Sequence, residues 1–271
     1  MYLTINGRRK QTNAVHLLQL EREEYCGQPP EKLIKIVNGF QTEEDLKLKE
    51  GDEITFIEKG ILPSKEVLEA MMCARHTPKV HDKAKQAHVA IAGLGGLGSN
   101  IAISLARTGV GHLHLIDFDE VEPSNLNRQQ YKIKHLGMPK TEALKSEIQE
   151  INPYIQVQVD TIRVTEENLK ELFLQDDIIC EAFDKPEAKA MLVNGILEQF
   201  PQKYIVAASG MAGYADSNDI VTKKITSHFY LCGDLVSNAE PGNGLMAPRV
   251  SICAGHQANM VLQLIIEKSD I

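Results

Sequence analysis

The segment 90–100, which reads AIAGLGGLGSN, constrains the fold of this chain more than any other part of its sequence. An apolar strand pattern precedes it and an apolar helical face follows it. Glycine suits a tight turn between strand and helix, because it accepts a positive φ and lets a phosphate approach the backbone closely. The free amides at the start of the helix then favour an anion at this position. The alternative is a glycine-rich turn without a ligand. The candidate nucleotide-binding residues here are Gly93, Gly95, Gly96 and Gly98.

Strand and helix patterns alternate from this segment to the C-terminus, which predicts an α/β domain with a Rossmann-like, mostly parallel sheet flanked by helices. The next strand, over 112–116, ends at Asp117. This acid lies roughly twenty residues beyond the glycines, the spacing of a carboxylate that binds ribose. Up to this point a dinucleotide-dependent dehydrogenase is supported equally well.

The first sixty residues predict a separate small β-grasp (ubiquitin-like) domain. Asn6-Gly7 is a hairpin turn signal, and a helix over 15–26 is followed by strands over 33–37 and 54–57. We therefore expect three parts: the β-grasp domain at 1–60, a helical linker at 61–86 and the nucleotide-binding domain at 87–271.

Composition excludes several classes of function. The net charge of -8 argues against nucleic-acid binding, which favours a basic face. No apolar run is long enough for a membrane span, and the N-terminus lacks the order of a signal peptide. Five scattered cysteines fit reduced thiols better than a disulfide framework. We expect a cytoplasmic protein with neither a nucleic acid nor a membrane as its partner.

Four motifs in order, GLGGLGSN, DFDEVEPSNLNRQ, GMPK and INP, resemble the ThiF/MoeB/HesA family of ubiquitin-activating-type adenylyltransferases. The resemblance covers about two-thirds of the chain and is closest to type ThiF. It implies an enzyme that joins the C-terminal carboxylate of a ubiquitin-like protein to AMP, using ATP and Mg²⁺ and releasing pyrophosphate. It also implies a homodimer.

The resemblance assigns the phosphate contacts to the polar loop. Arg128 and Lys140 would be catalytic cations that stabilise charge on the phosphates, with Asn125 and Gln129 as polar partners. The alternative is surface charge at a loop and a helix start. For Gln129 the two interpretations stay open.

The resemblance also assigns roles to acidic residues. Asp117 would hold the ribose hydroxyls, and Asp119 either assists or is a solvated loop acid. Asp184 would bind Mg²⁺, a hard ion that takes one or two carboxylates. The family usually has Asn after this aspartate, where this chain has Lys185. Arg75 is either the arginine that family members donate to the partner subunit or an ordinary exposed arginine.

The β-grasp part resembles ThiS, the sulfur carrier of thiazole synthesis, most clearly at KEGDEITFIEKG. A carrier of that type ends in a free Gly-Gly, whereas this chain continues through Lys59-Gly60-Ile61. We therefore expect a separate ThiS-like carrier protein as partner, and a docking or stabilising role for the fused domain.

The cysteines add two expectations. The chain lacks the two Cys-X-X-Cys pairs that form the family's usual zinc site, so we expect no structural zinc. Cys232 lies at a predicted strand–loop junction, where it is either a reactive thiol or a small packed residue, and packing is favoured.

Taken together, these patterns predict ATP-dependent adenylation of the C-terminal glycine of a ThiS-like carrier in thiamine (thiazole) biosynthesis. The alternative is a non-catalytic nucleotide-binding scaffold or regulator whose fused domain occupies the carrier dock.

Overall fold

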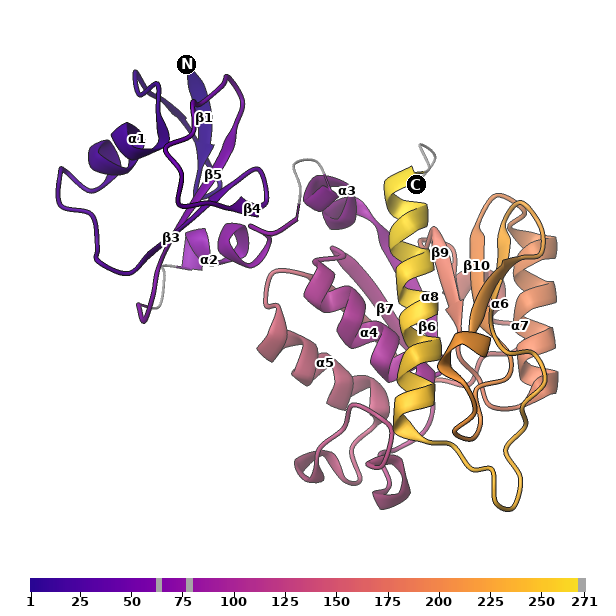
Figure 1. Ribbon diagram of the computed structural model, residues 1–271. Helices are drawn as coiled ribbons and strands as arrows, with labels where there is room; N and C mark the ends of the chain where they lie inside the picture. The colour runs from indigo at the N-terminus through magenta and orange to yellow at the C-terminus, as the bar shows by residue number, and fades with distance from the viewer. Residues whose placement is uncertain (62–64, 77–79, 268–271) are drawn as a thin grey trace. The chain divides into compact units, whose positions relative to one another are not determined.

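The computed structural model describes residues 1–61, 65–76 and 80–267, which form two compact units divided after Asp82 (Figure 1). Part of the predicted linker, at 62–64 and 77–79, lies outside the described residues. A single division does not test the predicted boundaries at 60 and 86, which stay predictions.

The first unit has a five-stranded sheet in the order β2-β1-β5-β3-β4. β1 is parallel to β5, and the other neighbours are antiparallel. The buried face packs Leu3, Ile54 and Phe56 against Leu17 and Leu20 of the helix α1. The hairpin, helix and strand order confirms the predicted β-grasp plan. Its elements are β1 (Tyr2–Ile5), β2 (Arg8–Gln11), α1 (Leu17–Glu24), β3 (Leu33–Val37), β4 (Phe40–Gln41), β5 (Glu53–Glu58) and α2 (Lys65–Met72), with α3 (Val80–Gln86) at the division.

The second unit has a seven-stranded sheet in the order β11-β12-β10-β9-β6-β7-β8, of which only the β11–β12 pair is antiparallel. The mostly parallel, helix-flanked sheet confirms the predicted fold class. Its main elements are β6 (His88–Ala92), α4 (Gly96–Thr108), β7 (His112–Ile116), α5 (Lys140–Ile151), β8 (Gln156–Asp160), α6 (Leu169–Leu172), β9 (Ile178–Glu181), α7 (Pro186–Gln199), β10 (Tyr204–Ala208), β11 (Val221–Lys224), β12 (Phe229–Gly233) and α8 (Ala247–Glu267).

The last two strands of this sheet run in opposite directions. β12 is parallel to β10, and only β11 is antiparallel. A short hairpin joins β11 to β12, which forces that pair to be antiparallel. The longer connection from β10 to β12 allows either direction, so local sequence could not decide it.

Helices cover both faces of this sheet (Figure 1). α4, α5 and α8 pack on one face, where α8 contributes Val250, Val261 and Leu264 to the larger core. α6 and α7 pack on the other face through Leu169 and Leu192. With both faces covered, the central strands are almost wholly apolar, as is typical of parallel sheets.

The order of the strands places a crevice at the end of β6. The chain passes from β6 to β7 on one side and later returns to β9 on the other, so the order reverses at β6. Ala92 of β6 lies opposite both Ile116 of β7 and Glu181 of β9. Ligands of open α/β sheets bind at such a reversal, beyond the carboxyl ends of the strands.

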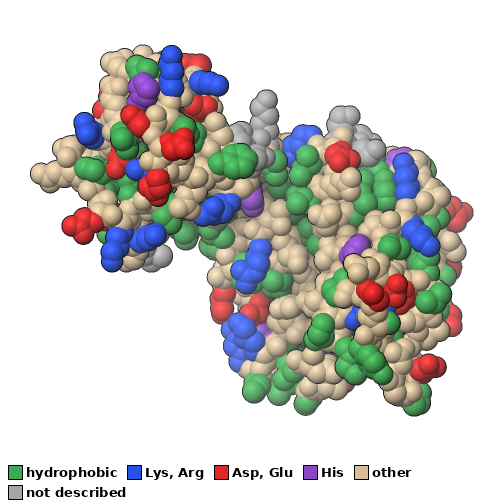
Figure 2. Space-filling model, viewed as in Figure 1, with side chains coloured by type: hydrophobic (Ala, Val, Ile, Leu, Met, Phe, Trp, Pro, Cys, Tyr) green, Lys and Arg blue, Asp and Glu red, His purple; other side chains and the backbone are tan. Residues whose placement is uncertain are grey.

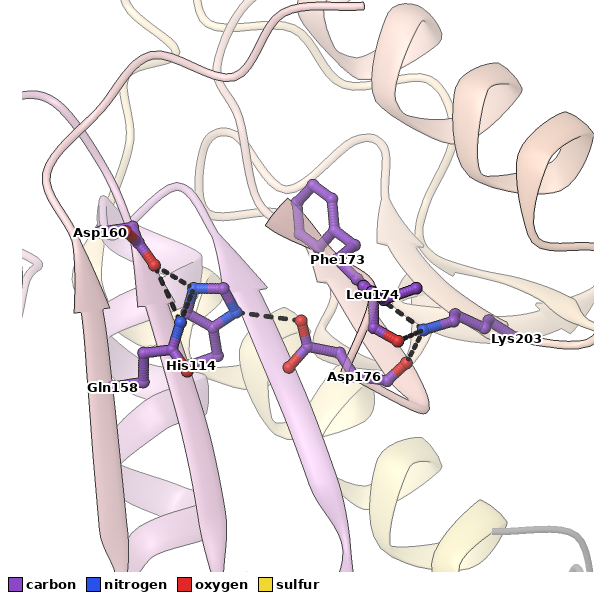
Figure 3. A network of polar contacts seen from close by, with 7 residues as sticks. All are labelled: His114, Gln158, Asp160, Phe173, Leu174, Asp176 and Lys203. Carbon is purple, nitrogen blue, oxygen red and sulfur yellow. Dashed lines mark hydrogen bonds and ion pairs between the residues drawn. The ribbon is translucent and has the colours of Figure 1, made fainter. Parts of the chain in front are cut away.

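A polar network anchors the connection between α6 and β9 (Figure 3). The His114 ring contacts Asp176 through Nδ1 at 2.9 Å and Asp160 through Nε2 at 2.8 Å. The buried ammonium of Lys203 donates to the carbonyls of Phe173, Leu174 and Asp176. These bonds hold the backbone of the segment between α6 and β9.

Charges of both signs share the surface of the first unit. On the visible face of the first unit, Lys and Arg side chains are interspersed with Asp and Glu (Figure 2). Across the described parts of the chain, we find no helix with the length and apolar character that a bilayer crossing requires.

Candidate functional site

The glycine segment forms the turn from β6 into α4, as predicted. Gly93 has a φ of 89°, and a Cβ at this position would lie 2.7 Å from the Ala182 carbonyl oxygen. A Cβ on Gly98 would lie 1.8 Å from the Gly93 carbonyl oxygen. Both positions therefore require glycine, and the close packing holds the loop against the start of α4. The unpaired amides of that helix start face the crevice end of the sheet.

Asp117 binds this loop directly. One carboxylate oxygen accepts the Leu94 amide at 2.6 Å, and the other accepts the Asp119 amide at 2.9 Å. The side chain is buried, with 8% of its surface exposed. Carboxylate oxygens can accept more than one hydrogen bond each, so this position leaves acceptor capacity for a ribose hydroxyl. The predicted ribose-binding residue thus also ties the end of β7 to the glycine loop.

The two predicted cations lie at the same end of the sheet. Lys140, the first residue of α5, is 6% exposed, and its ammonium is 2.9 Å from Asp119. Arg128 donates from Nη1 to the Ser124 carbonyl at 3.1 Å and to Asn127 Oδ1 at 2.8 Å. Asp119, which was left between an assisting role and a solvated acid, is therefore the ion-pair partner that positions Lys140.

The two predicted polar partners differ in what they contact. The Asn125 side chain accepts the Glu122 amide at 3.0 Å and so closes a short 3-10 turn. Gln129 is 8% exposed, and its Oε1 is buried without a hydrogen-bond partner. A buried, unpaired amide oxygen is costly, which is consistent with a ligand donor at this position.

A single cavity of about 790 Å³ connects most of these residues. Its volume lies in the range of small-molecule sites. Gly98 does not line the cavity, because it packs behind the loop against Gly93. The predicted residues that do line it are Gly93, Gly95, Gly96, Asp117, Asp119, Asn125, Arg128, Gln129, Lys140 and Asp184.

The residues of the cavity fit Mg²⁺ and a nucleotide. Asp184 follows β9 and is exposed to the cavity, so it offers the oxygen ligand that this ion prefers. Lys185 lines the cavity beside it and supplies a positive charge where the family usually has a neutral amide. The glycine loop, several cations and accessible carboxylates together form a set of groups suited to a nucleoside triphosphate.

Two further parts of the cavity were not predicted. The Lys189 ammonium lies 3.0 Å from the carboxylate of Glu181, which is 1% exposed. Burial raises the pKa of Glu181, and Lys189 opposes that rise. The Arg163 guanidinium carbon lies 3.9 Å from the centre of the Phe118 ring, and this cation–π pair lines the cavity. Neither pair has a sequence motif, because each joins residues that are adjacent only in the fold.

The loop before α8 closes one side of the cavity. Ser237, Asn238 and Leu245 line it, and a buried ion pair anchors the loop. Arg249 Nη2 is 2.7 Å from Asp234, whose other oxygen accepts the amides of neighbouring loop residues. Burial works against the charge of Asp234, yet these amides and Arg249 hold its pKa well below the usual range.

The structure favours packing for Cys232. Its side chain is fully buried, its sulfur is 3.5 Å from the Thr222 hydroxyl, and burial raises the pKa of its thiol to about 11. The thiol is therefore protonated near neutral pH and is a poor nucleophile. Arg75 donates to the Gln41 side chain at 2.8 Å, and its proposed action in a partner subunit stays a prediction.

Two models of known protein families match this chain. The model of the ThiF family matches residues 69–271, and that of ThiS-like ubiquitin matches residues 1–60. Molybdopterin-synthase adenylyltransferase of Haemophilus influenzae is 39% identical over 112 residues, 41% of this chain and 46% of that protein. Sulfur carrier protein adenylyltransferase of Thermus thermophilus is 32% identical over 130 residues, 48% of this chain and 43% of that protein. The matched region is thus under half the length of these curated relatives.

The fold is also found among solved structures. The tRNA N6-threonylcarbamoyladenosine dehydratase of Escherichia coli, solved in complex with ATP, has a TM-score of 0.68 and is 23% identical in sequence. The match covers 77% of this chain and 98% of that one. At this identity the likeness shows a shared fold.

Proposed function

The chain belongs to the ThiF family, and on that premise we propose that it is an ATP-dependent adenylyltransferase acting on a ubiquitin-like sulfur carrier protein. The observation that carries the proposal is that Arg128 and Lys140 line the same cavity as the glycine loop and Asp117. Two of the curated relatives are named adenylyltransferases, which supports the same reaction.

The reaction proposed for this cavity is a displacement at phosphorus. A carboxylate oxygen of the carrier's terminal glycine attacks the α-phosphorus of ATP, the bond to the leaving oxygen breaks, and pyrophosphate departs with its electron pair. Arg128 and Lys140 stabilise the charge that builds on the phosphate oxygens, and Asp117 holds the ribose. Asp184 would hold Mg²⁺, which when bound neutralises phosphate charge.

The carrier is a separate protein in this proposal. In the first unit β5 ends at Glu58, and the chain runs on through Gly60 toward α2, so this unit offers no free C-terminal carboxylate of its own. We assign the carrier to the ThiS type, and the pathway to thiamine synthesis, because the fused unit matches the ThiS-like family. A homodimer and a cytosolic location, in keeping with five cysteines that form no disulfide, complete the proposal.

The test is ATP–pyrophosphate exchange, measured with and without a ThiS-type carrier that ends in Gly-Gly. We expect exchange that depends on the carrier and falls about 10²–10³-fold in Lys140→Ala or Arg128→Ala, the usual effect of removing one group that stabilises the transition state. Lys170→Ala, an exposed lysine of α6 that does not line the cavity, is the matched control. Full activity in Lys140→Ala would contradict the assignment.

The same assay separates the alternatives. ATP binding without exchange would indicate the non-catalytic scaffold, in which the fused unit takes the place of the carrier. Exchange with a carrier of molybdopterin synthesis, but not with the ThiS type, would overturn the link to thiamine. A tRNA substrate is disfavoured by the net charge of -8.

A further inference from the structure

A cluster of metal-binding side chains lies in the first unit, outside the cavity described above. Cys73 and His76 follow the end of α2, and His81 lies in the first turn of α3. One ligand atom from each of the three lies within 4.8 Å of the other two. Within residues 1–61, 65–76 and 80–267, no other such group of three His, Cys, Asp or Glu side chains occurs.

The two imidazoles carry buried nitrogens that lack partners. Nδ1 of His76 and Nδ1 of His81 are both inaccessible to solvent and make no hydrogen bond. The other ring nitrogen of His81, Nε2, lies 3.6 Å from the carboxylate of Glu69. A buried polar atom without a partner requires an explanation, and an ion is one of the usual ones. A histidine that binds a metal through one nitrogen commonly directs the other at a carboxylate.

The chemistry and spacing of the cluster suit zinc. A thiolate and two imidazoles are ligands that Zn²⁺ prefers, and C-x₂-H-x₄-H is within the usual spacing for its sites. Bonds of about 2.0–2.3 Å in tetrahedral geometry place ligand atoms about 3.3–3.7 Å apart. The observed limit of 4.8 Å is wider by about 1 Å, a gap that small side-chain rotations can close.

We infer that Cys73, His76 and His81 bind one zinc ion, with Glu69 positioning His81. On binding, the Cys73 thiol gives its proton to solvent and the sulfur donates an electron pair to the metal. Water fills the fourth position. The ion cross-links the end of α2 to the start of α3. We expected no structural zinc because the chain lacks the family's two Cys-X-X-Cys pairs. The site inferred here uses other ligands, and zinc bound to it would make that expectation wrong.

The test uses the untagged full-length chain, freed of metal with a chelator and then titrated with Zn²⁺ against a chromophoric chelator. We expect one tight equivalent per chain. Affinity should fall at least tenfold in Cys73→Ser and His81→Gln. Cys26→Ser, which changes an exposed cysteine outside the cluster, should bind as the unchanged protein does. No stoichiometric binding, or equal affinity in all variants, would overturn the inference.

Two further measurements keep the test decisive if a ligand variant misfolds. Glu69→Gln retains all three ligands and should weaken zinc binding about 10–100-fold, the usual effect of losing a carboxylate that orients a ligand. Co²⁺ bound to the unchanged protein should show thiolate-to-metal absorption, and its absence would overturn the role of Cys73. Neither readout depends on adenylation, so this inference and the proposed function fail independently.

Discussion

Replacing Gly98 with alanine tests the close approach on which the nucleotide loop depends. The new methyl carbon would lie 1.8 Å from the Gly93 carbonyl oxygen, and because that atom is backbone, the loop itself has to move. Alanine gains about 1 kcal/mol over glycine within a helix, whereas overpacking costs about 1–3 kcal/mol. Since backbone must shift here, we take the upper part of that cost and expect a net loss of about 1–2 kcal/mol.

The chain offers a matched control for this change. Gly255 is an exposed residue inside α8, and a Cβ there meets nothing within 4 Å. Gly255→Ala therefore keeps the helix gain without the clash and should stabilise the protein by about 1 kcal/mol. The same chemical substitution is thus expected to have opposite effects at the two sites.

Calorimetry and nucleotide titration provide the measurements. For a unit of this size, 1 kcal/mol corresponds to a shift of roughly 2–4 °C in Tm, so Gly98→Ala should melt roughly 2–8 °C lower and Gly255→Ala roughly 2–4 °C higher. ATP affinity should fall at least tenfold in Gly98→Ala and stay unchanged in Gly255→Ala, because a displaced loop no longer directs its amides at the phosphates. A Gly98→Ala protein that melts no lower and binds ATP normally would refute the reasoning.

Two further predictions concern titratable groups in the core. Burial disfavours the charged form of His114, but the hydrogen bonds and charges of Asp176 and Asp160 outweigh it and raise its pKa above the ordinary 6.5. The stabilisation that His114 contributes is therefore full below pH 6.5 and is lost as the pH rises through the raised pKa. In urea unfolding, the difference in free energy of unfolding between the unchanged protein and His114→Gln should therefore shrink as the pH rises. A difference that stays constant with pH would contradict this. For the thiols, a maleimide should label the exposed Cys26 in the native protein but label Cys232 only after unfolding, as read by peptide mapping; equal rates would restore Cys232 as a reactive group.

Local patterns predicted a large part of the site because the chemistry lies in contiguous segments. The glycine loop and the loop from Asp117 to Gln129 each hold several contacts within a few residues, so each could be recognised without the fold. Ten of the eleven predicted site residues line one cavity, and the eleventh, Gly98, supports the loop from behind. Their chemical roles remain proposals until exchange is measured.

The remaining features depend on how the chain packs and match no motif. Glu181 meets Lys189 only when α7 folds against the end of β9, and Phe118 meets Arg163 only beside β8. The group formed by Cys73, His76 and His81 lies within nine residues of sequence, but it was missed because it matches no paired-cysteine motif. For the two pairs in the cavity, motifs and periodicity carry no direct signal.

The local elements, the glycine turn and the order of strands and helices could be predicted from periodicity and from residues that tolerate only certain backbone conformations. The parallel direction of β12, the pairing of Asp119 with Lys140 and the burial of Cys232 became evident only in the folded chain. Direction, ion pairing and burial are properties of neighbours brought together by packing. The energy of those contacts depends on distances that no local pattern encodes.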